Sequence, residues 1–265
     1  MMADPDGRRA TAMEGEHVVT RTAIRVPKMA ELVLAELRRE IASGVLAVDG
    51  NLPTEAELVT RFEVSRPTIR EAMRVLEMEG LISTKRGARN GARVQRPDPR
   101  IAARHTGLLL RSKATTLGDV YVARIAIEPY AARLLAGQRS PEALAHLRGL
   151  LEAEAATGDA VAWGRSAMVF HQAIVQECGN HTLAVLGGQL ADIVAGQSAV
   201  EMASHSGRDD QRTAYARVDR AHVRLLDLVE AGDADGAEAL WRRHLEAARE
   251  WYTTTEYVTV DELLA

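Results

Sequence analysis

Apolar residues recur at three- and four-residue intervals along most of the chain, and this spacing predicts helices. In the N-terminal part, three such segments follow one another closely, at about residues 27–43, 54–63 and 65–79. Thr54 and Glu57 have the spacing of a capping box at the start of the second segment. In the third segment, Ile69, Met73 and Leu76 fall on one face. The pattern predicts three short amphipathic helices that share a small core.

The third of these helices begins with polar residues that its apolar face leaves exposed. Ser65 can cap the helix, and Pro67 fits the first turn, where a backbone N–H is not needed. Arg66, Thr68 and Arg70 fall outside the apolar face. Arginine can pair with guanine edges in a major groove, and a helix N-terminus favours phosphates. We expect this helix to contact DNA; the alternative is a surface helix with solvated charges.

Two short strands are predicted directly after the third helix, at residues 81–84 and 92–94. The loop between them contains two glycines and three positive charges. A basic hairpin in this place is typical of a wing that contacts phosphates or the minor groove. Taken alone the loop could be an ordinary hairpin, but its position after three helices favours a wing.

Positive charge is concentrated in this part of the chain. Residues 61–96 contain nine Arg or Lys and four Glu, an excess of five positive charges. Because the whole chain carries a formal charge of −4, the remainder carries −9. A basic region attached to an acidic body fits a protein of which one domain binds nucleic acid.

Strand signals are scarce in the second part of the chain, where helical patterns follow one another with short breaks. We expect helices at residues 117–137, 140–156, 159–178, 182–202, 209–231 and 233–252. The fold class is therefore mostly α, with an antiparallel bundle of six or seven helices. The expected boundaries are a disordered leader at 1–25, a DNA-binding domain at 26–95, a proline-containing linker at 96–104, a helical domain at 105–256 and a tail at 257–265.

The remaining composition bounds the compartment. Cys178 is the single cysteine, which excludes an internal disulfide and is typical of a reducing compartment. The leader lacks the apolar core of a signal peptide. No apolar run approaches the roughly 20 residues of a membrane helix. We expect a soluble cytoplasmic protein that has no membrane segment.

The N-terminal motifs resemble the winged helix-turn-helix of GntR-family bacterial transcription regulators. The resemblance rests on Leu-Pro-Thr-Glu at 52–55, Val-Ser-Arg-Pro-Thr-Ile-Arg-Glu-Ala at 64–72 and Glu-Gly-Leu-Ile at 79–82. It implies operator contacts by the start of the third helix and by the wing tip. These contacts would come from Ser65, Arg66, Thr68, Arg70, Arg86 and Gly87. The sequence departs from the family pattern at two places that bear on the operator contacts. Ala56 stands where the family often has an arginine, and the wing is longer than usual.

The helical part resembles the FCD ligand-binding domain of the FadR subfamily. The resemblance rests on the run 122–132 and on the later landmarks Phe170-His171, Gly179-Asn180, His222, Gly232-Asp233 and Arg243-His244. It implies an all-helical domain that binds a small-molecule effector and forms a homodimer.

The resemblance also implies a metal site. His171, His222 and His244 match the three histidines that bind a divalent metal in many FCD domains, whereas Ala167 stands where the family usually has a ligating aspartate. Imidazole suits zinc and related ions, and three nitrogens leave room for water or an effector carboxylate. The alternative is three buried neutral histidines that bind an organic effector without a metal.

Arg124 is a further effector-binding candidate, because its charge falls on a largely apolar helix. It could clamp an effector carboxylate, or it could pair with Glu128 one turn away. Trp163 and Trp241 are expected in the core.

Together these features predict a ligand-responsive regulator, not an enzyme. A repressor dimer would bind an inverted-repeat operator on double-stranded DNA and be released by a small organic acid or acyl compound. Two alternatives stay open: a metal-dependent enzyme that uses the three histidines, and a constitutive DNA-binding dimer without a working sensor.

Overall fold

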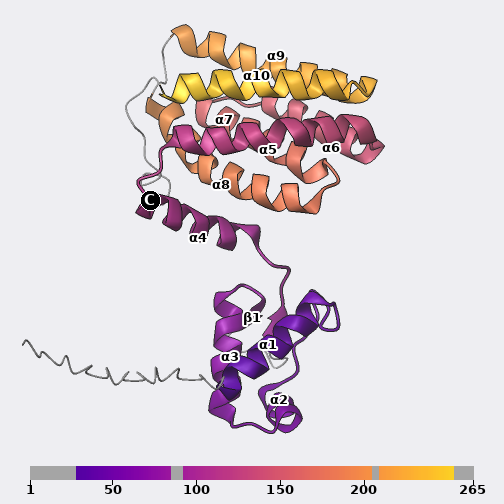
Figure 1. Ribbon diagram of the computed structural model, residues 1–265, viewed down its shortest axis with the longest axis vertical. Helices are drawn as coiled ribbons and strands as arrows, with labels where there is room; N and C mark the ends of the chain where they lie inside the picture. Colours follow the sequence, from indigo (N-terminus) through magenta and orange to yellow (C-terminus); the bar gives the residue numbers. More distant parts are fainter. Residues whose placement is uncertain (1–27, 85–91, 205–208, 254–265) are drawn as a thin grey trace, which may run out of the picture. The chain divides into compact units, whose positions relative to one another are not determined.

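The computed structural model describes residues 28–84, 92–204 and 209–253 (Figure 1). The expected leader at 1–25, the tail at 257–265 and the wing-tip residues Arg86 and Gly87 lie outside this part of the chain. The chain divides into two compact units. Residues up to Met78 together with Thr84–Val94 form the first unit, and Glu79–Ser83 with residues from Gln95 onward form the second.

Three helices and a two-stranded sheet follow one another in the N-terminal part, as predicted. They are α1 (Met29–Ala42), α2 (Glu55–Phe62), α3 (Arg66–Met78), β1 (Ile82–Thr84) and β2 (Ala92–Val94). The helices meet in a core in which Leu37, Leu58, Ile69 and Leu76 are completely buried. The apolar face of α3 differs slightly from expectation: Ala72 is buried, whereas Met73 is only half-buried.

The local signals at the helix ends act as the sequence predicts. Thr54 accepts a hydrogen bond from the Glu57 backbone N–H at 3.3 Å, and the Glu57 carboxylate accepts one from the Thr54 N–H at 2.7 Å. This capping box satisfies two backbone donors at the start of α2. Glu63 then adopts a left-handed backbone conformation (φ 52°) and ends α2 directly before α3. The capping box and the tight turn fix where α3 begins.

The second unit is an all-helical bundle of seven helices among the described residues. They are α4 (Pro99–Ser112), α5 (Leu117–Gln138), α6 (Pro141–Ala155), α7 (Ala160–Glu177), α8 (His181–Ser204), α9 (Asp209–Ala231) and α10 (Ala234–Thr253). The α5 helix runs along α10, and α7 runs along α8 (Figure 1). Each long helix begins and ends within a few residues of the expected position, because its caps and glycine stops are local signals.

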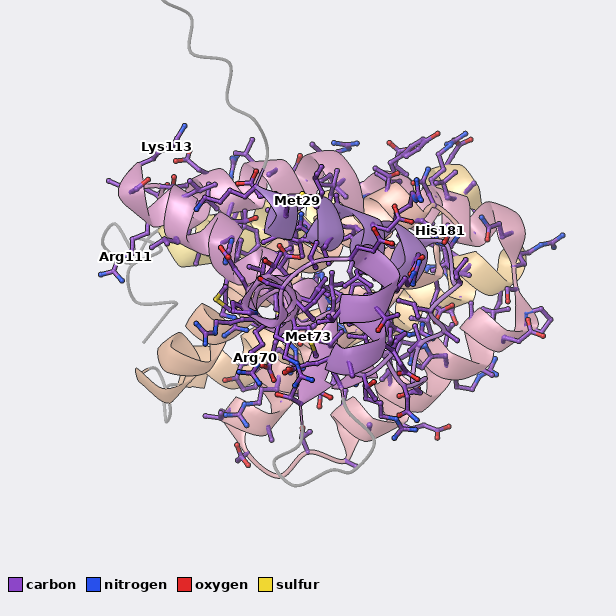
Figure 2. The ribbon with its side chains drawn as sticks, turned by 90° about the horizontal axis from the view of Figure 1, so that it is seen from below. Met29, Arg70, Met73, Arg111, Lys113 and His181 are labelled. Carbon is purple, nitrogen blue, oxygen red and sulfur yellow. The ribbon has the colours of Figure 1, made fainter. Side chains whose placement is uncertain are left out.

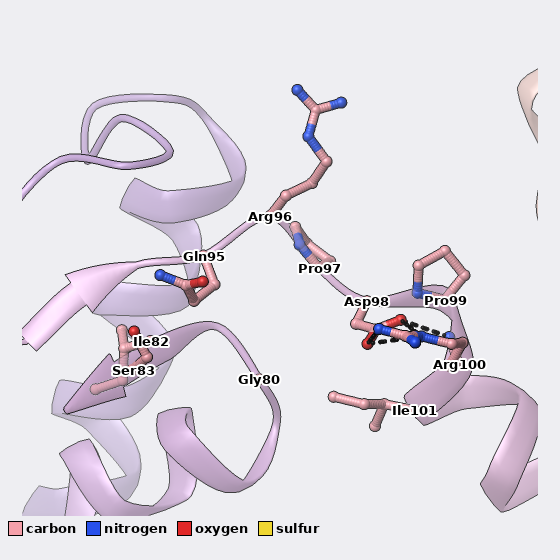
Figure 3. Close-up of a pocket in the computed structure, with 10 residues that line it drawn as sticks. All are labelled: Gly80, Ile82, Ser83, Gln95, Arg96, Pro97, Asp98, Pro99, Arg100 and Ile101. Atoms are coloured by element: carbon pink, nitrogen blue, oxygen red, sulfur yellow. Dashed lines mark hydrogen bonds and ion pairs between the residues drawn. The ribbon is translucent and has the colours of Figure 1, made fainter. Parts of the chain in front are cut away.

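One boundary differs from expectation. Residues 99–104, expected in the linker, form the first turns of α4. Asp98 caps this helix by accepting a hydrogen bond from the Arg100 backbone N–H at 2.9 Å, and its carboxylate also binds the Arg100 side chain (Figure 3). Pro99 occupies the first helical position, where its missing N–H costs nothing. Of the two prolines that suggested a linker, Pro99 therefore starts a helix, whereas Pro97 lies before it.

The bundle has a continuous apolar core that surrounds a small polar centre. Phe170, Leu135, Ile174 and Trp241 are completely buried in it. Within the described residues, none of the helices is long and apolar enough to cross a membrane. The polar centre lies where α5, α7, α9 and α10 face one another, and it contains the three histidines.

Candidate functional site

The start of α3 presents its polar residues to solvent. Ser65 accepts a hydrogen bond from the Thr68 backbone N–H at 3.4 Å, and the two hydroxyl oxygens lie 2.8 Å apart. Arg66 and Arg70 are exposed. The Arg70 Nε donates to a Glu55 carboxylate oxygen at 3.0 Å, and Arg70 lies one turn before Met73 on the same helix (Figure 2). The first two turns of α3 thus present two exposed arginines, one of them paired with Glu55, on a surface that suits a DNA groove.

The three predicted histidines come together in the bundle. His171 lies on α7, His222 on α9 and His244 on α10, and one ring nitrogen of each lies within 4.8 Å of the others. The Nε2 atoms of His171 and His244 are 3.2 Å apart. Three different helices thereby contribute one imidazole each to a single place.

Two of the three imidazoles have a buried carboxylate behind them. The Nδ1 of His171 lies 2.8 Å from a Glu128 oxygen, and the Nδ1 of His222 lies 3.1 Å from both oxygens of Glu154. The Nε2 of His222 is buried and has no hydrogen-bond partner among the described residues. An unpaired buried imidazole nitrogen is costly unless a ligand occupies the space in front of it.

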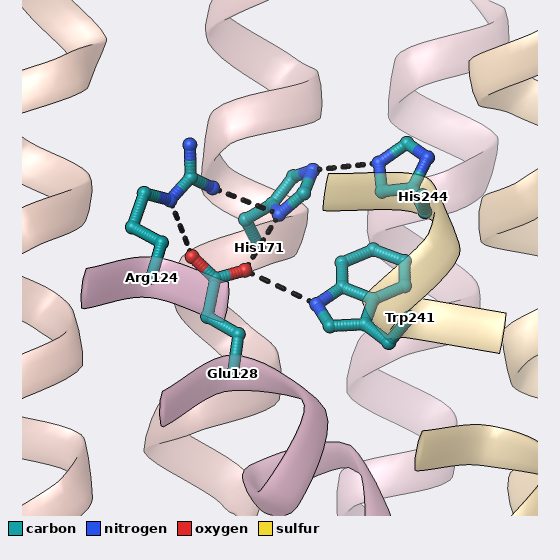
Figure 4. A network of polar contacts seen from close by, with 5 residues as sticks. All are labelled: Arg124, Glu128, His171, Trp241 and His244. Carbon is teal, nitrogen blue, oxygen red and sulfur yellow. Dashed lines mark hydrogen bonds and ion pairs between the residues drawn. The ribbon is translucent and has the colours of Figure 1, made fainter. Parts of the chain in front are cut away.

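Arg124 forms an ion pair with Glu128, which was one of the two interactions expected for it. Its Nε donates to a Glu128 oxygen at 2.5 Å, and both side chains are almost fully buried (Figure 4). Trp241 donates its indole N–H to the other Glu128 oxygen at 3.1 Å. The Arg124 charge is therefore balanced inside the protein, one turn of helix from its partner.

The surroundings set the charge of this cluster. Burial alone would raise the pKa of Glu128, but the charges of Arg124 and His171 and their hydrogen bonds lower it to about 2. Burial lowers the pKa of His171 to about 4 and that of His222 to about 3. The pKa of His244 is also well below its usual value, mainly because of burial. All three imidazoles are neutral near pH 7, as metal ligands must be.

Ala167 lies one helical turn before His171 and is buried. A carboxylate at this place would be a fourth protein ligand, and the methyl group cannot replace it. The three histidines nevertheless fit a divalent ion, because their nitrogens converge and the buried Nε2 of His222 needs a partner. When bound, such an ion would supply a positive charge that attracts an anionic effector.

Three residues of this site were not singled out from the sequence as functional. Glu128 was considered only as a partner for Arg124, and Trp241 only as a core residue; the latter contacts all three histidine rings. The spacing of Trp241 three residues before His244 could have indicated the contact. Glu154 carried no signal in the sequence, because it reaches His222 from another helix, α6.

Comparison with known proteins agrees with both halves of the chain. Residues 29–94 match bacterial regulatory proteins of the gntR family, and residues 119–247 match the FCD domain. The HTH-type transcriptional repressor NanR of Salmonella arizonae is 26% identical over 239 residues, which cover 87% of each chain. NanR of Cronobacter sakazakii is 27% identical over 228 residues, covering 83% of this chain and 84% of the relative.

A solved structure supports the fold. A GntR protein of Streptococcus agalactiae superimposes with a TM-score of 0.63 at 20% identity, covering 83% of this chain and 99% of that one. This likeness supports the fold over most of the chain. The chain belongs to the GntR family of bacterial regulatory proteins, carries an FCD domain, and is a ligand-responsive transcription regulator, not an enzyme.

Proposed function

We propose that this regulator is a repressor that binds an inverted-repeat operator as a homodimer. The observation that carries this proposal is the exposed N-terminal turn of α3, with Arg66 and Arg70 beside the Ser65 cap. Two such helices related by a twofold axis would fit two half-sites of a palindrome. The relatives named as repressors support the direction of regulation. The wing residues Arg86 and Gly87 are proposed to add backbone contacts.

We further propose that His171, His222 and His244 hold zinc or another divalent ion. The convergent nitrogens and the unpartnered Nε2 of His222 support this site. With Ala167 in place of an acid, three neutral ligands leave the ion with its full positive charge. A small organic acid is the class of effector that such a site favours. The role of Arg124 as a direct effector clamp stays a prediction, because its guanidinium is engaged by Glu128.

Effector control requires that the acid binds one arrangement of the dimer more tightly than the other. The test is fluorescence anisotropy with a labelled duplex from upstream of the protein's own gene, titrated at two salt concentrations. Preference for this duplex over random DNA, lost on adding an organic acid and regained on its removal, is the expected result. Preference that no acid changes, with or without a chelator, would indicate a constitutive DNA-binding dimer instead. No preference for any palindromic duplex would refute the DNA-reading role.

A further inference from the structure

We propose that Glu128 and Glu154 are positioning residues, which fix the ring protons of His171 and His222 so that both Nε2 atoms face the ion. The proposal rests on the metal-binding function proposed above. Glu128 belongs to α5 and Glu154 to α6, and neither of these helices carries a histidine of the triad. The bundle therefore brings in two further helices behind the ligands.

A neutral imidazole has one N–H donor and one nitrogen acceptor, and the hydrogen bond at one nitrogen decides the role of the other. An ionised carboxylate can only accept. Toward Glu128, whose oxygen lies 2.8 Å away, the Nδ1 of His171 can therefore only donate. The ring proton then sits on Nδ1, and Nε2 keeps the lone pair that a metal needs.

At His222 two independent observations lead to the same protonation. Both oxygens of Glu154 lie 3.1 Å from Nδ1, and at least one of them carries no proton and can accept a hydrogen bond from that side of the ring. On the other side, Nε2 is buried without a partner among the described residues. A lone pair that points at an ion explains this nitrogen, whereas a buried N–H there would have nothing to donate to.

At His171 two groups compete for Nδ1. The guanidinium of Arg124 lies 3.0 Å from it and can only donate, so it would favour the opposite tautomer, with the proton on Nε2. Glu128 is closer to Nδ1, at 2.8 Å, and is held in place by donors from Arg124 and Trp241 on its two oxygens. These donors need an acceptor and thus fix Glu128 in the role that orients His171 for the ion.

The first test measures the zinc affinity of the full-length protein by competition with a chromophoric chelator. Glu128→Gln and Glu154→Gln keep the side-chain shape but weaken the acceptor, and each should reduce zinc affinity by roughly 10- to 100-fold. The matched control is Glu177→Gln. Glu177 lies 2.9 Å from the Nδ1 of His146, outside the triad, so this variant should leave zinc affinity unchanged.

The second test needs no variant and is not affected by a loss of folding. Long-range ¹⁵N–¹H spectra of the metal-free wild-type protein report which ring nitrogen carries the proton. We expect Nδ1–H for His171 and His222. Nε2–H on both rings, or an unchanged zinc affinity in both glutamine variants, would overturn the proposal.

The outcomes also separate this inference from the metal site itself. His222→Ala should abolish tight zinc binding if the triad is the site. Tight binding in wild type and in His222→Ala alike would refute the metal site, while the tautomer spectra would still decide the roles of Glu128 and Glu154. Binding that depends on His222 but not on either glutamate would refute the positioning role alone.

Discussion

The Nε2 atom of His171 lies 3.2 Å from the Nε2 atom of His244. Two ring nitrogens bound to one tetrahedral zinc ion at its usual bond length would lie about 3.3 Å apart. Without an ion, the two atoms can be this close only if one of them carries the proton and donates to the other. The spacing therefore suits a shared ion.

Replacing Ala167 by aspartate should raise zinc affinity, because a carboxylate one turn before His171 would add a fourth ligand and a negative charge. The metal-free variant should be less stable than wild type by roughly 1–3 kcal/mol, since the new polar group is buried. Urea unfolding with and without zinc measures both effects. Ala167→Ser is the control, with a small polar group but no charge. Destabilisation that zinc does not reverse would show that residue 167 does not face the ion.

Replacing Arg66 or Arg70 by alanine should weaken operator binding by about 1–3 kcal/mol for each arginine that pairs with a base. The affinity for random duplex should change less, because base contacts add to specific binding only. Arg165→Ala removes an exposed arginine from α7, in the helical bundle, and serves as the control. Anisotropy titrations with operator and with random duplex give the ratio of the two affinities for each variant. An unchanged ratio in both α3 variants would contradict the assigned DNA-reading face.

The metal-free protein should lose stability as the pH falls from 7 to 5. Unfolded histidines take up protons near pH 6.5, whereas burial keeps the pKa of His171 at about 4 and that of His222 at about 3. In this window the unfolded state binds more protons, so each histidine lowers the free energy of unfolding by up to about 1.4 kcal/mol per pH unit. Urea titrations at several pH values measure how steeply the free energy of unfolding changes with pH.

Two acids act in the opposite direction in the pH range where they titrate. Burial raises the pKa of Glu154 and of Asp219, so the folded state holds their protons more tightly. The His222→Gln variant lacks one of these rings. Its free energy of unfolding should therefore depend less steeply on pH than that of the wild type. A slope that is equal in the two proteins would show that His222 is not held neutral by the fold.

Replacing Trp241 by phenylalanine should destabilise the bundle by roughly 1.5–3 kcal/mol, because the ionised Glu128 loses a buried donor. Trp163→Phe is a matched comparison. Trp163 donates to Asp219 at 2.9 Å, but burial raises the pKa of that acid, so its charged form matters less. Thermal unfolding of the two variants should rank Trp241→Phe as the more damaging. The reverse order would contradict the charge assigned to Glu128.

The sequence alone predicted the elements well. Caps, glycine stops and apolar spacing are signals between residues a few positions apart, and they placed α2, α3 and the long helices of the bundle close to their observed ends. The expected linker at 96–104 was too long, because proline has two local meanings: it can interrupt a chain or, as Pro99 does, occupy the first position of a helix. The cap at Asp98 resolves this ambiguity.

The sequence also named the three histidines, but through a resemblance and not through their spacing. What the tertiary structure decided is which groups lie behind them. Arg124 and Glu128 share a helix, so their pairing could be foreseen as one of two outcomes. The contact of Glu154 with His222 could not, because it joins α6 to α9. Periodicity shows which face of a helix is buried, but only the packing of helices shows which buried polar groups meet.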